Sequence, residues 1–289
     1  MIPTGCSYHR PQSIDQAVDA LTSGSGAVIL AGGQSLIPLM KLGQSRPAAL
    51  VDVAGIASLR YLNVEGRRIA IGALTTARDL ERSTDLAAAV PVFAQAAKQI
   101  ADPAVRARGT FVGALAFGDP GGDWPAIGLA LEATLEVCGP SGSRQVQIGA
   151  NLTPWEAIKR NEIIASATIE VPDGRTAAVY AKVRHPASGY ALVGVAVLLT
   201  LDAAGVCTRC RIAATGALRR PARLPTIEAS ILGSNLDGLD LEEVAASLRA
   251  PLAGITGDAY AGSAQRAQLL RVLIHRTLHQ TVAKLTSHP

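Results

Sequence analysis

The sequence has few aromatic residues and few cysteines, and each shortage excludes a class of protein. Phe, Trp and Tyr make up 3% of the 289 residues, so platforms on which single-stranded nucleic acid could stack are scarce. The cysteines, Cys6, Cys138, Cys207 and Cys210, are too scattered for a disulfide framework or for the thiolates of an iron–sulfur cluster. Cys207 and Cys210 have the spacing of a metal-binding pair, but a second pair is missing. Because residues three apart in a strand point to opposite faces, we expect both to serve packing.

Long hydrophobic runs and dense charge are also missing. The uncharged stretch at 186–201 is interrupted by Ser188, Gly189 and Gly194 and is shorter than the about 20 residues that span a bilayer. The first ten residues lack the charged and apolar regions of a signal peptide, so we expect a cytoplasmic protein. The net charge of +4 is dispersed, with its densest cluster at 219–223. Nucleic-acid binding, which needs basic residues on one face, is not expected.

Common nucleotide-binding and hydrolytic motifs are absent. The sequence has no Gly-Lys dipeptide, hence no Walker A loop, and no Gly-x-Gly-x-x-Gly. A doubly wound dinucleotide-binding fold is therefore not expected. No Gly-x-Ser-x-Gly elbow is present, and His275 and His279 lack the glutamate and third ligand of a zinc protease. We expect neither a catalytic residue nor a metal site on this chain.

The residues that are present predict large mixed domains. The composition, 48% hydrophobic and 17% charged, is typical of globular proteins, and at about 150 residues per domain the length indicates roughly two domains. Mixed helices and strands give way, after a turn at 172–174, to long strands and then helices, which places a boundary near residue 175. The expected helices are 13–21, 36–41, 76–81, 91–100, 226–232, 241–248 and 263–284, and the expected strands are 27–30, 50–53, 68–73, 134–138, 163–171, 177–184, 191–201 and 206–215.

Two glycine-rich segments are candidates for function. The strand at 27–30 runs into Gly32 and Gly33, and Ser35 could cap the helix that follows. Glycines let backbone N–H groups approach phosphate oxygens unhindered, although Gly-Gly after a strand is also an ordinary tight turn. The second segment, 106–123, is expected to be irregular, and long glycine-rich loops inside compact domains are usually functional.

A series of motifs runs in order through the whole chain. It begins with AGGQSLIPLMK at 31–41, RP at 46–47, LVD at 50–52, IGALTT at 71–76, RGT at 108–110, and DP at 119–120 with Asp123. It continues with Lys182, Arg184 and YALVGVA at 190–196. At this order and spacing the motifs resemble those of the FAD-binding medium subunit of molybdenum hydroxylases, the group of carbon monoxide dehydrogenase, xanthine dehydrogenase and N-heterocycle dehydrogenases.

The resemblance implies an α+β fold in two parts. Residues 1–175 would form an FAD-binding domain of the vanillyl-alcohol-oxidase (PCMH) type, with subdomains at about 1–55 and 56–175. Residues 176–289 would form a C-terminal sheet-and-helix domain like that of carbon monoxide dehydrogenase flavoproteins. The boundary agrees with the change of pattern near residue 175.

The resemblance also implies two loops that bind the FAD phosphates. The first would hold the pyrophosphate through backbone amides, with a hydroxyl added by its serine, and consists of Ala31, Gly32, Gly33, Gln34 and Ser35, followed by Leu36. The second contains Thr110, Gly113 and Ala114. Where the family reads Thr-Ile-Gly-Gly-Asn, this chain has TFVGA at 110–114, and Phe117 stands where histidine is common. One glycine and one side-chain amide are lost, so we expect looser FAD binding than in relatives, with Val112 tolerated if its backbone lies in the β region.

Four further residues would lie along the rest of the cofactor. Asp123 would accept hydrogen bonds from ribityl or sugar hydroxyls, or else cap the turn before Trp124. Lys182 would place a fixed cation near the flavin, or else be a surface lysine. Ile164 and Tyr190 would wall the isoalloxazine ring, and both could equally belong to the core.

The function implied is that of an electron-transfer subunit in a heteromeric molybdenum hydroxylase. Electrons from a large molybdopterin-binding subunit would pass through [2Fe-2S] clusters on a small iron–sulfur subunit to FAD on this chain, then to an external acceptor. The alternatives are a scaffold subunit that has lost FAD through the changed second loop, and a stand-alone flavin oxidase. The second is disfavoured because the sequence has no additional substrate domain.

Overall fold

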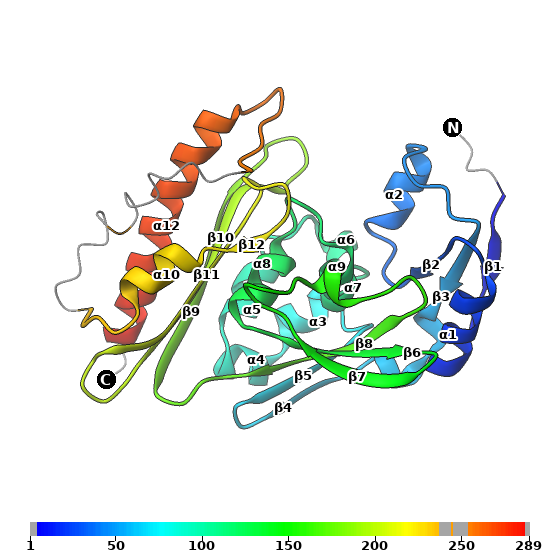
Figure 1. Ribbon diagram of the computed structural model, residues 1–289, viewed down its shortest axis with the longest axis horizontal. Helices are drawn as coiled ribbons and strands as arrows, with labels where there is room; N and C mark the ends of the chain where they lie inside the picture. The colour runs from blue at the N-terminus through cyan, green and yellow to red at the C-terminus, as the bar shows by residue number, and fades with distance from the viewer. Residues whose placement is uncertain (1–4, 237–243, 245–253, 287–289) are drawn as a thin grey trace.

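Three β-sheets lie side by side in this computed structural model, which describes residues 5–236, 244 and 254–286 (Figure 1). A small sheet lies at one end, a five-stranded sheet occupies the middle, and a four-stranded sheet lies at the other end, next to the long C-terminal helix. The expected helix at 241–248 falls outside the described residues except for Val244.

The small sheet is parallel and has the order β1-β3-β2. Its strands are β1 (Ser7–His9), β2 (Ala27–Leu30) and β3 (Ala49–Asp52), and its helices are α1 (Ile14–Ser23) and α2 (Leu36–Lys41). Parallel neighbours need crossover connections, and α1 and α2 supply them. Ser13 caps α1 by accepting a hydrogen bond from the N–H of Gln16, as a serine at this position predicts.

The middle sheet is antiparallel and has the order β4-β5-β8-β6-β7. Its strands are β4 (Leu62–Glu65), β5 (Arg68–Gly72), β6 (Thr134–Gly139), β7 (Gly142–Gln147) and β8 (Ile163–Glu170). Ile69 and Ile71 on β5 are fully buried while Arg68 is exposed, the alternation of a sheet with one covered face. The short helices of this part are η1 (Val53–Gly55), η2 (Ala57–Leu59), α3 (Ala77–Arg82), α4 (Thr84–Ala89), α5 (Val92–Ala97), α6 (Pro103–Arg106), α7 (Phe111–Phe117), α8 (Asp123–Ala130) and α9 (Pro154–Ala157).

The C-terminal sheet is antiparallel and is covered on both faces. Its strands, in the order β12-β11-β10-β9, are β9 (Arg175–Arg184), β10 (Ala191–Leu201), β11 (Cys207–Thr215) and β12 (Ala222–Arg223). One face packs on α10 (Pro225–Ile231) and α12 (Ser263–Thr286), through residues such as Val195 and Val197. The other face joins the core of the preceding domain, through Tyr180 and Ala196. This continuous packing joins the two halves of the chain.

The segment at 106–123, expected to be irregular, contains the last residue of α6, all of α7 and the first residue of α8, so that prediction is wrong. Thr110 caps α7 by accepting a hydrogen bond from the N–H of Gly113, and Gly118 ends it in the left-handed conformation at φ +62°. Thr110 and Gly118 therefore serve as the caps of a helix. Every residue of α8 is buried, because this helix is packed on β10, β11 and β12 as well as on α7.

Cys207 and Cys210 are buried and free, and they belong to the same hydrophobic cluster. The expectation that they point to opposite faces is wrong because the register between β10 and β11 shifts between Thr200 and Leu201. Such a bulge reverses the alternation of side chains. The predicted packing role is confirmed for both residues.

Candidate cofactor site

The loop between β2 and α2 presents free backbone donors. Gly33 has φ +73°, a conformation that glycine adopts without steric cost. Within the described part of the chain, the N–H groups of Gly33, Gln34 and Ser35 donate to no acceptor. Ser35 occupies the N-cap position of α2 but makes no side-chain cap hydrogen bond, so that expectation is wrong. Successive free N–H groups and a free hydroxyl are the donors that an anion such as phosphate requires.

The second predicted loop packs directly on the first. A Cβ added to Gly32 would lie 2.1 Å from the carbonyl oxygen of Arg108, and one added to Gly109 would lie 3.7 Å from Cγ of Gln34. Backbone contact this close is possible only with glycine at residue 32. The structure therefore brings 31–35 and 108–113 together, as expected for one binding site.

The end of the second loop is a helix start. The Thr110 hydroxyl accepts from Gly113 N–H at 3.2 Å, so these two groups satisfy each other. Val112 lies within α7 and its side chain is buried, so the condition under which valine would be tolerated here, a β-region backbone, is not met. Its N–H finds no acceptor within the described residues. Ala114 is partly buried against the core.

Asp123, the first residue of α8, sits in a buried polar cluster with two side chains of β9. Its Oδ1 accepts a hydrogen bond from the Tyr180 hydroxyl at 2.5 Å, and its Oδ2 accepts one from Lys182 Nζ at 3.0 Å. Lys182 also donates to the carbonyl of Gly189 at 3.1 Å, and its side chain is 2% exposed. The alternative of a surface lysine is therefore wrong. The Asp123 carboxylate bonds to side chains and not to the turn before Trp124, so the capping alternative is wrong too.

Burial dominates the electrostatics of this cluster. It raises the pKa of the Asp123 carboxyl, and Lys182 and Tyr180 oppose that rise. Burial and the nearby Asp123 carboxylate raise the pKa of Tyr180 well above its ordinary value, so the phenol stays protonated and acts as a donor. Removing Asp123 or Lys182 would leave the other as a buried charge without an opposite charge beside it.

Ile164 and Tyr190, the two predicted flavin walls, differ in exposure. Ile164 lies on β8, is 4% exposed and belongs to the core of the N-terminal part. Tyr190 lies between β9 and β10, and 42% of it is exposed. A Cβ added to Gly121 would lie 3.3 Å from Cβ of Tyr190, which places this ring beside the turn that precedes Asp123.

Sequence reasoning missed Tyr180 and Thr215. Tyr180 lies two residues before Lys182 on β9, and the period of two in a strand could have placed both on the face that meets Asp123. Thr215 ends β11 and bonds to the turn before α8. Only the tertiary packing of the C-terminal sheet reveals that contact.

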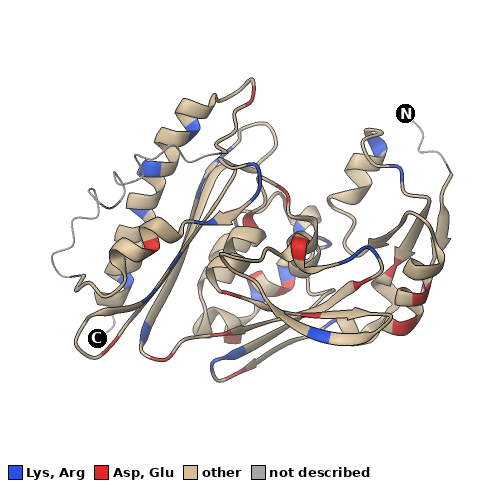
Figure 2. Ribbon diagram, viewed as in Figure 1, with Lys and Arg blue, Asp and Glu red and all other residues tan. Residues whose placement is uncertain are grey.

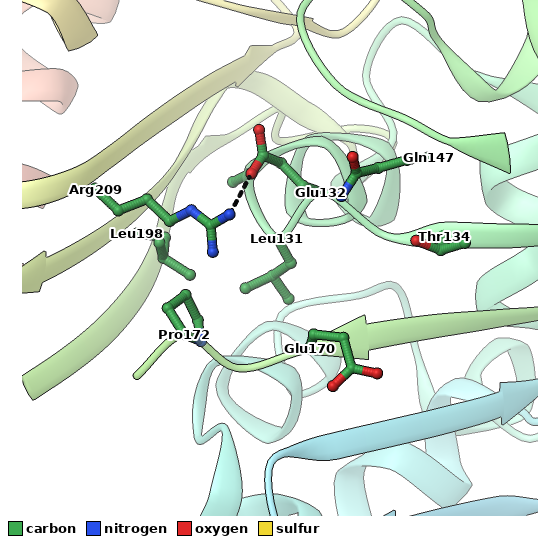
Figure 3. Close-up of a pocket in the computed structure, with 9 residues that line it drawn as sticks. Leu131, Glu132, Thr134, Gln147, Glu170, Pro172, Leu198 and Arg209 are labelled. Carbon is green, nitrogen blue, oxygen red and sulfur yellow. Dashed lines mark ion pairs between the residues drawn. The ribbon is translucent and has the colours of Figure 1, made fainter. Parts of the chain in front are cut away.

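A separate small cavity of about 50 Å³ lies where the middle and C-terminal sheets meet (Figure 3). Figure 3 shows Arg209 reaching toward Glu132 at the edge of this cavity. Their ion pair, between Nη2 of Arg209 and Oε2 of Glu132, has a length of 3.4 Å. Glu132 also pairs with Arg211 and Arg223, at 2.7 and 2.9 Å. Burial raises the pKa of Glu132, but these two arginines outweigh it, and the pKa is lowered. The cavity has room for a few water molecules and not for a dinucleotide.

The described residues contain no cluster of His, Cys, Asp and Glu able to hold a metal ion, and none of their helices is long and apolar enough to cross a membrane. Lysine and arginine are spread over all parts of the fold (Figure 2).

Comparisons with known proteins agree with this geometry. Residues 4–173 match the family described as the FAD binding domain in molybdopterin dehydrogenase, and residues 178–281 match the CO dehydrogenase flavoprotein C-terminal domain. The carbon monoxide dehydrogenase medium chain of Afipia carboxidovorans is 35% identical over 98% of this chain and 99% of that protein. The 6-hydroxypseudooxynicotine dehydrogenase complex subunit alpha of Paenarthrobacter nicotinovorans is 34% identical, over 96% and 95%.

Solved structures show the same fold. The carbon monoxide dehydrogenase of Hydrogenophaga pseudoflava that lacks the Mo-pyranopterin moiety superimposes with a TM-score of 0.89 at 33% identity, covering 98% of this chain and 99% of that one. The expected α+β architecture, an FAD-binding domain followed by a CO dehydrogenase flavoprotein C-terminal domain, is confirmed. The chain thus belongs to the FAD-binding medium subunits of the molybdenum hydroxylase family, which are oxidoreductase subunits similar to the medium chain of carbon monoxide dehydrogenase.

Proposed function

We propose that this chain holds FAD without a covalent bond and relays electrons from a partner subunit to an external acceptor. The observation that carries the proposal is the row of free N–H groups at Gly33, Gln34 and Ser35, packed against 108–113. Free donors at a glycine loop suit a pyrophosphate, and Gly33 has no side chain of its own that could obstruct the approach of an anion. Bound FAD would supply the ability to collect electrons singly and release them as a pair.

The residues would divide the task of holding the cofactor. The first loop, from Ala31 to Leu36, would bind the pyrophosphate, and the start of α7, from Thr110 to Ala114, would lie against it. Asp123 would accept a ribityl hydroxyl: a carboxylate has about four lone-pair sites, and Tyr180 and Lys182 leave at least one of them free.

Lys182 would hold positive charge close to the flavin. Its ammonium group is fixed by Asp123 and by the carbonyl of Gly189, so little reorganisation is needed when negative charge develops nearby. Tyr190 and Ile164 would border the isoalloxazine ring, one from the hairpin before β10 and the other from β8.

We further propose that the partners are a large subunit with molybdopterin and a small subunit with [2Fe-2S] clusters, in a cytoplasmic complex. The names of the relatives, a medium chain and a subunit of a dehydrogenase complex, support an assembly. Residues 1–175 and 176–289 would be its FAD-binding and C-terminal domains. The change from the middle sheet to the C-terminal sheet between β8 and β9 supports this division.

Purification of the tagged chain from its native host tests the proposal. We expect one larger chain with molybdenum, one smaller chain with iron and sulfide, and FAD bound to this chain. A complex whose medium chain is folded but free of flavin would favour the scaffold alternative. A single chain with its own substrate turnover would favour the stand-alone oxidase.

A further inference from the structure

The turn between α7 and α8 is held by the C-terminal sheet. Three successive carbonyl groups of this turn accept hydrogen bonds from that sheet. The Pro120 carbonyl accepts from Gly216 N–H at 2.6 Å, and the Gly121 carbonyl accepts from Ala191 N–H at 3.1 Å. The carbonyls of both Pro120 and Gly122 lie within hydrogen-bond distance of the Thr215 hydroxyl.

Thr215 contributes the side-chain contact in this set. It is fully buried at the end of β11, and its Oγ1 lies 2.8 Å from the Pro120 oxygen and 2.9 Å from the Gly122 oxygen. A hydroxyl has a single proton, so this donor is shared between the two carbonyls. It therefore fixes the turn on both sides of Gly121, directly before Asp123.

The sheet end that carries Thr215 is itself rigidly held. Gly216 has φ +80°, and a Cβ there would lie 2.5 Å from the carbonyl oxygen of Ala191. The buried Arg266 of α12 donates to the carbonyls of Gly216 and Leu192, at 2.5 and 3.3 Å. The hydroxyl of Thr215 thus projects from a fixed support.

We propose that Thr215 is a positioning residue of the FAD site, which it affects through the 118–122 turn and Asp123. This rests on the proposed function, because it assumes that Asp123 contacts bound FAD. Thr215 lies 42 residues beyond the FAD-binding domain family match, which ends at residue 173. The C-terminal domain would then set how tightly the preceding domain holds its cofactor.

The test compares FAD release from full-length variants, each in the assembled complex. Thr215→Val removes the hydroxyl and keeps the shape. Thr200→Val is the matched control: Thr200 is buried in the same sheet and bonds to the Thr176 hydroxyl at 3.0 Å, about 30 Å along β10 from Ala191. Thr215→Ser keeps the donor. The dissociation rate is followed by the rise of flavin fluorescence, and the unfolding midpoint of each flavin-free variant is measured separately.

We expect Thr215→Val to release FAD about threefold to tenfold faster than the parent, as loss of one hydrogen bond predicts. Thr200→Val and Thr215→Ser should release it at the parental rate. Equal release rates for Thr215→Val and Thr200→Val would overturn the inference. If Thr215→Val does not fold, Thr215→Ala replaces it in the comparison. Alanine also lacks the hydroxyl, and it places no methyl group against the two carbonyls.

A further variant separates this inference from the proposed function. Gly33→Val should abolish FAD binding if the β2–α2 loop holds the cofactor. Loss of FAD in Gly33→Val together with parental release from Thr215→Val would refute the positioning role alone. Full FAD retention in Gly33→Val would refute the proposed site.

Discussion

The contact between Gly32 and Arg108 offers a sharp test of the two-loop site. In Gly32→Ala the new Cβ would lie 2.1 Å from the Arg108 carbonyl oxygen. Ordinary carbon–oxygen contacts are about 3.3 Å or longer, so the two loops would have to separate by about 1 Å. The obstacle is a backbone carbonyl and not the end of a flexible side chain, so no rotamer change relieves it.

The expected loss of affinity follows from that displacement. Hydrogen bonds to a charged group contribute about 1.5–3 kcal/mol each, and a shift of about 1 Å would cost two of them. The combined loss of about 3–6 kcal/mol weakens FAD binding by at least about a hundredfold. Overpacking itself costs about 1–3 kcal/mol of stability, which a domain with about 5–15 kcal/mol withstands.

The assay is titration of flavin-free chain with FAD, followed by flavin fluorescence, with circular dichroism as a check of folding. Gly262→Ala is the control, because a Cβ at Gly262 meets no atom within 4 Å. The control should bind FAD like the parent. A Gly32→Ala chain that is folded and binds FAD within about threefold of the parent would refute the two-loop site.

Other predictions concern single groups of the fold. Gly33→Val should leave circular dichroism near that of the parent while flavin absorption disappears. A branched side chain is strained at φ +73°, and its Cβ would lie 3.2 Å from Cγ1 of Ile37 and 3.3 Å from Cδ1 of Leu30, so the loop that carries the free N–H groups would have to change its conformation. Asp123→Asn should lower the free energy of unfolding by about 3 kcal/mol by leaving the buried Lys182 unpaired, and adding Lys182→Met should recover part of it in denaturant unfolding. Glu132→Gln should lower the free energy of unfolding by about 2 kcal/mol at neutral pH. The pKa of Glu132 is lowered in the folded state, so its stabilisation is present above the unfolded pKa and is lost as pH falls through the folded pKa. The free energies of unfolding of parent and variant should therefore converge in acid. Ala114→Asn should slow FAD release by restoring a side-chain amide, and a rate equal to or faster than the parent's would refute that role.

Local sequence signals predicted much of the fold because they depend on nearby residues. The helix expected at 13–21 is α1, with Ser13 as its N-cap, and the strand expected at 191–201 is β10 with the bounds that the structure shows. The segment 106–123 was misjudged because its glycines looked like loop residues, whereas Gly118 ends a helix and Gly113 lies within one. Helix α8 has no polar face to reveal its periodicity, since it is buried on all sides.

The candidate site likewise has one part that local sequence predicts and another part that depends on the tertiary structure. The first loop could be found from Gly32 and Gly33 after a strand, since the signal is contiguous. The partners of Asp123 come from residues 57 and 59 positions away, Tyr180 and Lys182, and no local pattern brings them together. Thr215 is further still from the turn it holds, so its contact required the tertiary structure.

The central claim, that this chain is an FAD carrier, is tested most directly by the flavin content of the complex purified from its native host. Acid precipitation followed by chromatography of the supernatant measures FAD per medium chain and separates free from covalent flavin. The account predicts about one FAD per chain, all of it in the supernatant. A folded chain without flavin, or flavin that remains in the protein pellet, would contradict it.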